Sequence, residues 1–401
     1  MKPLICSLLI LPLLNLSSLQ ADSTKNLDKV LEDAIYLETT TPQVHLSGYV
    51  DAGYIYNFTG TAAPQSSYGT DTNAQGEFNL NAVKLVLEKA LSEENSFQAG
   101  FRVDLMLGED AGALGANTAA AGSSDTFYLQ QAHVLIRLPL GNGLDLQVGK
   151  FGSILGYEAD ERPANLNITQ GFNASLDPGP SVGILASYPL NEQISLIGGL
   201  INGNGQDSNV GLDNEGDGYA LTGGLSLTHP SAKAETQLTY HYAPWGDSGF
   251  AQVEDESLLG LNWWGNWSPL CCNDKLLLAF NASAWFANDF NTPGAGGNDD
   301  SSSFYTAALY AKYQFNSLFS LAGRTEYAHN DDNNLLALPG RSIGFSDDVF
   351  SWTTTAGFNL TEELLFRLEY RADLGTSVIS DANGLSGDTA HRASAQVVYT
   401  F

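Results

Sequence analysis

Strict alternation of apolar and polar residues is the feature that most constrains this chain, and it begins at Val44. From Val44 to Phe58 every even-numbered position is apolar, aromatic or glycine, and the polar residues fall on odd-numbered positions. A period of two places successive side chains on opposite faces of a β-strand. The same pattern returns in residues 97–107, 219–228 and 364–373. We therefore expect an all-β fold whose strands each have one apolar and one polar face.

The connections between these strands alternate between short and long. Short turns are expected near residues 91–95, 139–143, 189–192, 229–233, 268–274, 316–317 and 361–363. Long loops are expected near residues 59–76, 108–125, 152–180, 202–217, 244–255, 288–302, 329–347 and 375–388. Fifteen connections predict about sixteen antiparallel strands, with a range of 14 to 18. Short periplasmic turns and long extracellular loops are typical of a transmembrane β-barrel.

Membrane insertion through strands is also consistent with the hydropathy of the chain. Beyond the N-terminal residues, no run of 18 apolar residues would form a transmembrane helix. A closed barrel pairs every backbone group and leaves no sheet edge in lipid. Aromatic residues are expected to form a girdle at each membrane interface. The candidates are Tyr56, Phe58, Tyr242, Tyr327 and Trp352 at the extracellular side, and Tyr188, Tyr399 and Phe401 at the periplasmic side.

Three segments follow from these patterns. Residues 1–21 are predicted to be a signal peptide, with Lys2 before an apolar run and Ala21 at the cleavage site. Residues 22–43 form a periplasmic N-terminal segment that includes a short amphipathic helix. Residues 44–401 form the barrel. The location that these segments imply is the bacterial outer membrane, with the barrel inserted after signal-peptide cleavage.

The net charge of −28 excludes one class of partner and suggests another. Nucleic-acid binding requires clusters of lysine and arginine, which this chain does not have. Most of the acidic residues fall in the predicted long loops. A negative extracellular mouth would concentrate cations and repel anions, so a preference for cations is expected.

No cofactor is expected, and the metal-site signal is weak. Asp207, Asn209 and Asp213 have the oxygen-rich spacing of a calcium loop, but the bidentate glutamate that completes such a loop is missing. A solvated acidic loop is the favoured interpretation, and bound calcium is the alternative. Cys271 and Cys272 fall in a predicted turn, where two cysteines cannot complete a zinc site. We interpret the cysteine pair as incidental.

Several short motifs resemble the β-barrel porin-2, OmpL-like, family over residues 44–401. They are Gly149-Lys150-Phe151, Gly156-Tyr157-Glu158, Ser181-Val182-Gly183-Ile184, Tyr188-Pro189, Ile201-Asn202-Gly203, the opening Leu46-Ser47-Gly48-Tyr49-Val50-Asp51 and the C-terminal Phe401. The resemblance implies an outer-membrane barrel with a porin function. It implies fold and location more firmly than substrate.

A barrel of sixteen strands is wide enough for an aqueous lumen unless something fills it. The longest loop, residues 152–180, is the candidate constriction, and it carries Glu158, Asp160, Glu161 and Arg162. Further pore-lining candidates lie on the polar phase of their strands or in the family motif. These are Lys150, Arg102, Asp104, Arg137, Arg324, Glu326, Arg367, Glu369, Arg371, Asp373 and Arg392.

Two interpretations explain why the arginines fall on the polar positions of their strands, which point into the barrel. Arginine at the bilayer midplane costs about 2–4 kcal/mol, and this cost alone would keep it off the lipid face. Alternatively, the arginines form a basic wall opposite the acidic loop, with a transverse field that orients dipolar solutes. Glu326, Glu369 and Asp373 are near enough in sequence to neutralise the arginines in pairs.

Passive diffusion of small hydrophilic solutes is the function that these features predict. An enzyme is the first alternative, but His133 and His241 lie in no hydrolase motif, so none is expected. A non-conducting adhesin or structural barrel that acts through its loops is the second alternative. Expected partners are outer-membrane lipid, small hydrophilic solutes or ions, a second and third copy in a homo-trimer, and the barrel-assembly machinery, which would recognise Phe401.

Overall fold

A computed structural model describes residues 43–58, 76–114, 127–202, 219–243, 257–288, 302–330, 347–380 and 386–401. The predicted signal peptide and nearly all of the N-terminal segment lie outside the described residues. So do most of the long loops, including the calcium candidates Asp207, Asn209 and Asp213.

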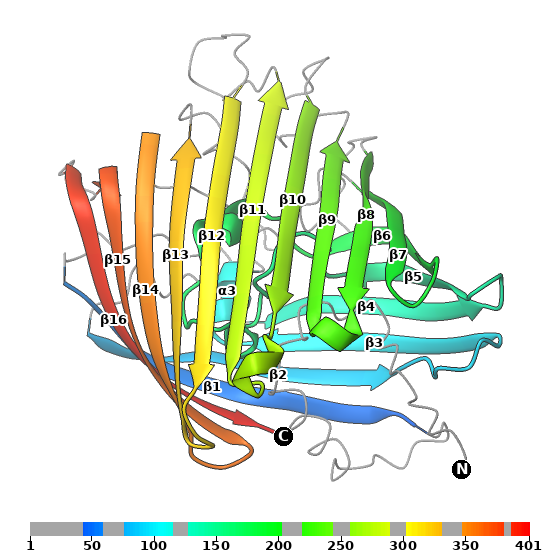
Figure 1. The fold of residues 1–401 in the computed structure, drawn as a ribbon, viewed down its shortest axis with the longest axis horizontal. Coiled ribbons are helices and arrows are strands. Elements are labelled where there is room, and N and C mark those ends of the chain that lie inside the picture. The colour runs from blue at the N-terminus through cyan, green and yellow to red at the C-terminus, as the bar shows by residue number, and fades with distance from the viewer. Residues whose placement is uncertain are drawn as a thin grey trace.

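Sixteen antiparallel strands form one closed barrel in which each strand pairs with its neighbours in the sequence (Figure 1). The prediction of sixteen strands is confirmed. The strands are β1 His45–Asn57, β2 Glu77–Lys89, β3 Gln98–Leu107, β4 Phe127–Leu138, β5 Leu144–Phe151, β6 Ser181–Pro189, β7 Ile194–Asn202, β8 Tyr219–His229, β9 Ala234–Ala243, β10 Ser257–Trp267, β11 Leu276–Asn288, β12 Ser302–Gln314, β13 Phe319–Asn330, β14 Asp347–Asn359, β15 Leu364–Ser380 and β16 Ser386–Thr400.

The first and last strands close the barrel. β1 pairs with β16 in a register that sets Tyr49 opposite Thr400. Next to this pair, the Gly48 N–H donates to the Phe401 carbonyl at 2.9 Å, and the Phe401 N–H donates back at 3.0 Å. A side chain at Gly48 would collide with the Lys84 carbonyl, so glycine allows this close approach. The closed ladder leaves no unpaired strand edge.

All seven predicted short turns lie between consecutive strands at one end of the barrel, which we call the short-turn end. Two of them contain single turns of 3₁₀ helix, Pro230–Ala232 and Leu270–Cys272. One predicted loop needs correction. β15 continues to Ser380 and β16 begins at Ser386, so most of the loop expected at 375–388 is strand.

Apolar side chains cover the outside of the barrel and polar side chains point inward, as the alternation predicted. In β15, Leu368 and Tyr370 are 45% and 39% exposed on the outer face. Arg367, Glu369 and Arg371 alternate with them and are at most 5% exposed. No helix in the described ranges is long and apolar enough to cross a membrane.

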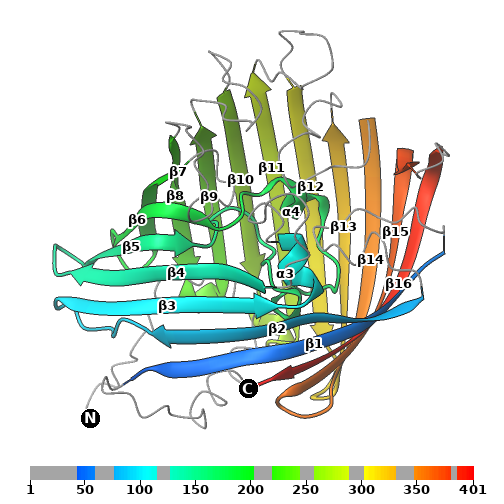
Figure 2. The same cartoon turned by 180° about the vertical axis from the view of Figure 1, so that it is seen from behind.

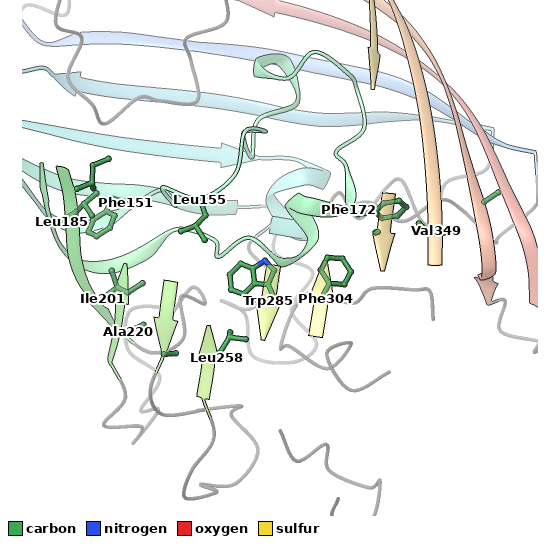
Figure 3. Close-up of a cluster of buried hydrophobic side chains, with 14 residues drawn as sticks. Phe151, Leu155, Phe172, Leu185, Ile201, Ala220, Leu258, Trp285, Phe304 and Val349 are labelled. Carbon is green, nitrogen blue, oxygen red and sulfur yellow. The ribbon is translucent and has the colours of Figure 1, made fainter. Parts of the chain in front are cut away.

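The interior of the barrel contains chain as well as side chains. Two short helices, α3 Glu109–Leu114 and α4 Phe172–Leu176, lie between the walls of the barrel (Figure 2). α3 packs against β2, β3 and β4, whereas α4 packs against β11 and β12. Figure 3 shows a buried apolar cluster in which Leu155 and Phe172 lie near Trp285 and Phe304 of the barrel wall. The barrel is therefore partly filled by its own connections.

Candidate functional site

The predicted constriction loop, residues 152–180, runs through the inside of the barrel between β5 and β6. It contains the 3₁₀ turn Arg162–Ala164 and helix α4. We call residues 152–180 the inner segment. Residues of β2 and of β9 to β15 contact it, so it spans the interior from one wall to the other.

Arg324 of β13 attaches the wall to the inner segment at two points. Its guanidinium donates to the Glu158 carboxylate at 2.6 Å and to the Thr169 carbonyl at 2.7 Å. Glu326 lies 3.8 Å from the same guanidinium. All three charged side chains are buried. Hydrogen bonds between charged groups are stronger than neutral ones, so Arg324 ties two separate points of the segment to the wall.

Two arginines of β15 extend this attachment. Arg367 donates to the carbonyls of Asn165 at 2.7 Å and Arg162 at 2.9 Å. Arg371 donates to the Gln170 carbonyl at 2.7 Å. We call Arg324, Arg367 and Arg371 the arginine anchor. Because these guanidinium groups bind backbone carbonyls, they hold the path of the segment and not merely its side chains.

Carboxylates of the same wall bind the backbone N–H groups of the segment. Glu369 accepts hydrogen bonds from the N–H groups of Ile168 and Thr169, the latter at 3.0 Å. Glu326 accepts from the Asn173 N–H at 3.2 Å. Both signs of charge on the wall are therefore matched to backbone dipoles of the segment.

The opposite wall is attached through ion pairs. Arg162 makes a two-fold contact with Asp110 of α3, with both N–O distances 2.7 Å and both side chains buried. Glu161 pairs with Lys84 of β2, which also lies 3.0 Å from Asp104. Burial by itself raises the pKa of Glu161, but the charge and hydrogen bond of Lys84 outweigh it, so the pKa is lowered.

Other predicted site residues form pairs within the wall. Arg102 binds Asp104 at 2.8 Å and Glu88 at 3.1 Å, and its side chain is 15% exposed. Arg137 binds both oxygens of Asp145 near the short-turn end.

The remaining predicted residues include two further wall pairs and one weak contact to the inner segment. Asp373 accepts from Arg371 at 2.8 Å, and Arg392 donates to Asn57 at 2.9 Å across the closing strands. Asp160 of the inner segment faces Gln130 at 3.5 Å.

Lys150 reaches the interior through a local distortion. Val148 points outward with 40% exposure, and regular alternation would send Lys150 the same way, yet Lys150 is 4% exposed. Gly149 has a φ of +129°, which residues with a side chain rarely adopt, and a Cβ there would collide with the Ala132 carbonyl. The lysine Nζ lies 4.8 Å from the centre of the Tyr128 ring. The Gly-Lys motif thus has a structural reason.

The burial of these residues corrects one part of the sequence interpretation. Glu326, Glu369, Asp373, Arg392 and the arginine anchor are at most 5% exposed, because they lie between the wall and the segment or within wall pairs. They do not form a free basic wall opposite an acidic loop. The interpretation in which acidic neighbours offset the arginines describes the observed contacts better. A pore-lining role remains a prediction for the predicted residues.

Several residues that hold the segment escaped the sequence analysis. From the sequence alone, no ion-pair partner could be assigned to Lys84 or Asp110. In the segment itself, Leu166 and Ile168 are buried, and they alternate with Asn167 and Thr169, whose side chains bond Thr355 and Glu369 of β14 and β15. This local alternation was visible in the sequence and could have indicated a buried stretch.

The two histidines considered as catalytic candidates lie in strands β4 and β9 of the wall, and the cysteine pair lies in a short turn. Neither ring nitrogen of His133 faces a nucleophile, since Nδ1 lies 3.0 Å from the Lys150 carbonyl and Nε2 lies 3.2 Å from the Gln147 amide. His241 packs 6.1 Å from Trp285. Within the described ranges, no three His, Cys, Asp or Glu residues cluster as metal ligands would. Cys271 and Cys272 lie in a short turn, as predicted.

The family described as "Putative beta-barrel porin-2, OmpL-like" matches residues 43–401. The chain belongs to this family. It is therefore a porin-like outer-membrane β-barrel, which the sequence motifs had indicated. No curated protein matches the chain significantly.

Solved structures share the fold of this family member at low sequence identity. The outer membrane channel DcaP of Acinetobacter baumannii is 12% identical with a TM-score of 0.59, over 89% of this chain and 97% of that one. OmpT of Vibrio cholerae in a trimer form is 9% identical with a TM-score of 0.56, over 89% and 99%. OprB of Pseudomonas putida is 11% identical with a TM-score of 0.54, over 93% and 96%. At these identities the likeness concerns the fold.

Proposed function

We propose that this barrel is an outer-membrane channel for passive diffusion of small hydrophilic solutes, with the inner segment as its constriction. The observation that carries the proposal is the attachment of the inner segment to the wall by Arg324, Arg367 and Arg371 inside a closed barrel. A constriction must keep a constant shape to select by size, and buried charge-assisted hydrogen bonds provide that rigidity.

Ion preference is the finer part of the proposal. The net charge is −28, and the predicted long loops contain acidic pairs such as Asp299-Asp300 and Asp331-Asp332. Inside the barrel, acidic groups and carbonyls offset the charges of the arginine anchor. The mouth would then dominate the potential that a mobile ion meets, and cations would be favoured.

Single-channel recording of the refolded protein in a planar bilayer tests both parts. We expect stable open steps and, under a salt gradient, a reversal potential on the cation side. An anion-side reversal potential would contradict the dominance of the acidic mouth but would leave the proposed channel function intact. A folded barrel that never conducts would overturn the channel.

A non-conducting barrel that binds a surface partner is the second candidate, and the burial of the inner wall favours it. Residues that point inward from opposite parts of the wall, such as Asp51, His241 and Thr353, are at most 1% exposed. The same recording distinguishes the two candidates, since a plugged barrel shows no steps at any voltage.

Assembly completes the proposal. We infer a homo-trimer, the form of the OmpT structure of similar fold. We also infer that the assembly machinery recognises the aromatic C-terminus, because Phe401 ends the strand that closes the barrel. Cross-linking in native membranes should yield a three-subunit species. Phe401→Ala should lower the amount of inserted barrel, whereas Phe315→Ala, in an exposed turn, should leave it unchanged.

A further inference from the structure

Charge is distributed unevenly over the inner wall. We call β13 to β16 and β1 to β4 the charged wall. These strands carry the arginine anchor, its carboxylates and the group formed by Lys84, Arg102 and Asp104. On the inner face of β8 to β12, the charged side chains among the described residues are Glu235 and Lys312, both near the short-turn end. The rest of that face carries amides, hydroxyls, indoles and apolar side chains such as Leu258 and Phe304, with His241 beside Trp285.

Six side chains define what we call the neutral wall: Gln237, Thr239, Asn262, Trp264, Asn281 and Trp285. Each is at most 2% exposed. Each also has one polar atom without a hydrogen-bond partner. The acceptor atoms are Gln237 Oε1 and Asn262 Oδ1, the donor atoms are Asn281 Nδ2 and the two indole Nε1 atoms, and Thr239 Oγ1 can do either.

Unpartnered buried polar atoms are costly, at about 1–3 kcal/mol each, and they require a reason here as they do on the charged strands, where Arg324, Arg371 and Asp373 also have one each. Here donors and acceptors are balanced, the six side chains themselves carry no formal charge, and two of them are indoles. A hydroxyl group both donates and accepts, and the C–H face of a polyol packs on an aromatic ring. An ion at this wall would lose hydration without gaining a counter-charge, which costs several kcal/mol.

Residues 154–157 of the inner segment, which contact Gln237 and Trp264 of this wall, have fewer polar contacts to the barrel than residues 158–173, of which Asn173 donates to the Asn281 carbonyl at 3.4 Å. Gln237 donates to the Ile154 carbonyl at 2.8 Å, and the Tyr157 ring lies 5.8 Å from Trp264. In contrast, residues 158–173 are held by the arginine anchor and by Glu369 and Glu326. Residues 154–157 can therefore yield to a solute while the anchored part keeps its place.

We propose that the neutral wall binds uncharged, polyhydroxylated solutes such as sugars, and that it sets the solute class of the channel. This inference rests on the proposed channel function. The charged wall serves to hold the inner segment, and the neutral wall is the face offered to solutes.

Flux of three solutes with one carbon skeleton tests the proposal: glucose, gluconate and glucosamine. Proteoliposomes are assayed in about 1 M salt, where the Debye length is about 3 Å and the charge of the mouth is screened. Glucose should cross about tenfold faster than either charged solute, a ratio equal to about 1.4 kcal/mol. Gluconate or glucosamine crossing as fast as glucose would overturn the inference.

A double variant locates the effect. Asn262→Leu with Asn281→Leu removes both amides of a hydrogen-bonded pair, whose Nδ2–Oδ1 distance is 2.7 Å. Glucose flux should fall towards that of gluconate, while conductance in potassium chloride is kept. The control is Ser394→Ala, which removes a buried, unpartnered hydroxyl from β16 and should change neither. Unchanged glucose flux in the double variant would place selection elsewhere.

Conductance separates the failure of this inference from the failure of the channel. If the wild-type barrel conducts potassium chloride but does not favour glucose, the neutral-wall inference alone fails. If it conducts nothing and passes no solute, the proposed channel function is overturned, and the neutral-wall inference is overturned with it. Thr239→Val, a nearly isosteric change, provides a second test where the double variant does not fold.

Discussion

The charged wall and the neutral wall of this barrel use buried polarity in opposite ways. On β13 and β15, Arg324, Arg371 and Glu369 all have partners in the inner segment. On β9 to β11, the Thr239 hydroxyl and the Trp285 indole N–H are as deeply buried and have no hydrogen-bond partner at all, whereas Arg324 and Arg371 each keep one unpartnered nitrogen beside those that bind the segment. The difference teaches that burial alone does not identify a structural residue. The partners of its polar atoms do.

Loss of a cation from the charged wall should have the largest effect. Arg324→Met leaves Glu158 and Glu326 buried without the guanidinium, and breaking a buried pair costs about 3–5 kcal/mol. Urea unfolding in lipid vesicles measures the free energy. The control is Lys233→Met, whose pair with Asp274 is over a third exposed and contributes about 0–1 kcal/mol. Equal losses in the two variants would contradict the anchoring role.

Neutralising one carboxylate of the same wall should cost less. Glu369→Gln weakens the acceptor of the Ile168 and Thr169 N–H groups, and a hydrogen bond to a charged group contributes about 1.5–3 kcal/mol. Amide hydrogen exchange at these two residues should accelerate. Glu235→Gln, whose carboxylate binds Asn266 and not the segment, should leave both exchange rates unchanged. Unchanged exchange in Glu369→Gln would remove this carboxylate from the anchoring contacts.

Acidification should loosen the attachment to β2. Because Lys84 keeps the pKa of Glu161 below its usual value, the stabilisation is complete at neutral pH and is lost as the pH falls through that lowered pKa. Amide exchange of residues 158–162 should rise on acidification below about pH 4. In Glu161→Gln the rise should be absent, and a rise of equal size would assign the effect to another group.

A hydroxyl on the neutral wall should be the least costly to remove. Thr239→Val deletes an oxygen that has no partner, so stability should be unchanged or slightly increased. The matched change on the charged wall is Thr355→Val, where the hydroxyl accepts from Asn167 and donates to Glu369, both at 2.7 Å. We expect Thr355→Val to cost about 1–3 kcal/mol. Equal costs would erase the distinction between the walls.

Much of the fold could be predicted because each strand carries its own evidence. Alternation in residues 44–58 or 364–373 is local, and a slip by one residue would turn charged groups such as Arg367 towards lipid. The residues that predict each short turn are likewise close together in the sequence. The extension of β15 and β16 was missed because nothing in residues 375–388 distinguishes a long hairpin from a loop until the two strands pair.

The candidate site was predicted only in part. The length of the loop at 152–180 and the inward phase of the arginines indicated an interior segment opposite charged strands. The contacts themselves could not be predicted, because Arg371 and its acceptor Gln170 are 201 residues apart. Backbone carbonyls also have no signature in the sequence, since every residue has one.

The sequence by itself determined the barrel fold, the approximate number of strands, which face of a strand points inward, and the family. These properties depend on the period of the side chains and on short motifs. Only the tertiary structure decided what the buried polar groups do. Whether an inward arginine or amide finds a partner depends on which distant backbone lies across the barrel from it. Strand closure and the path of residues 152–180 set that distance, and together they separate a wall whose charged groups hold the segment from a wall of uncharged polar groups that hold it at fewer points.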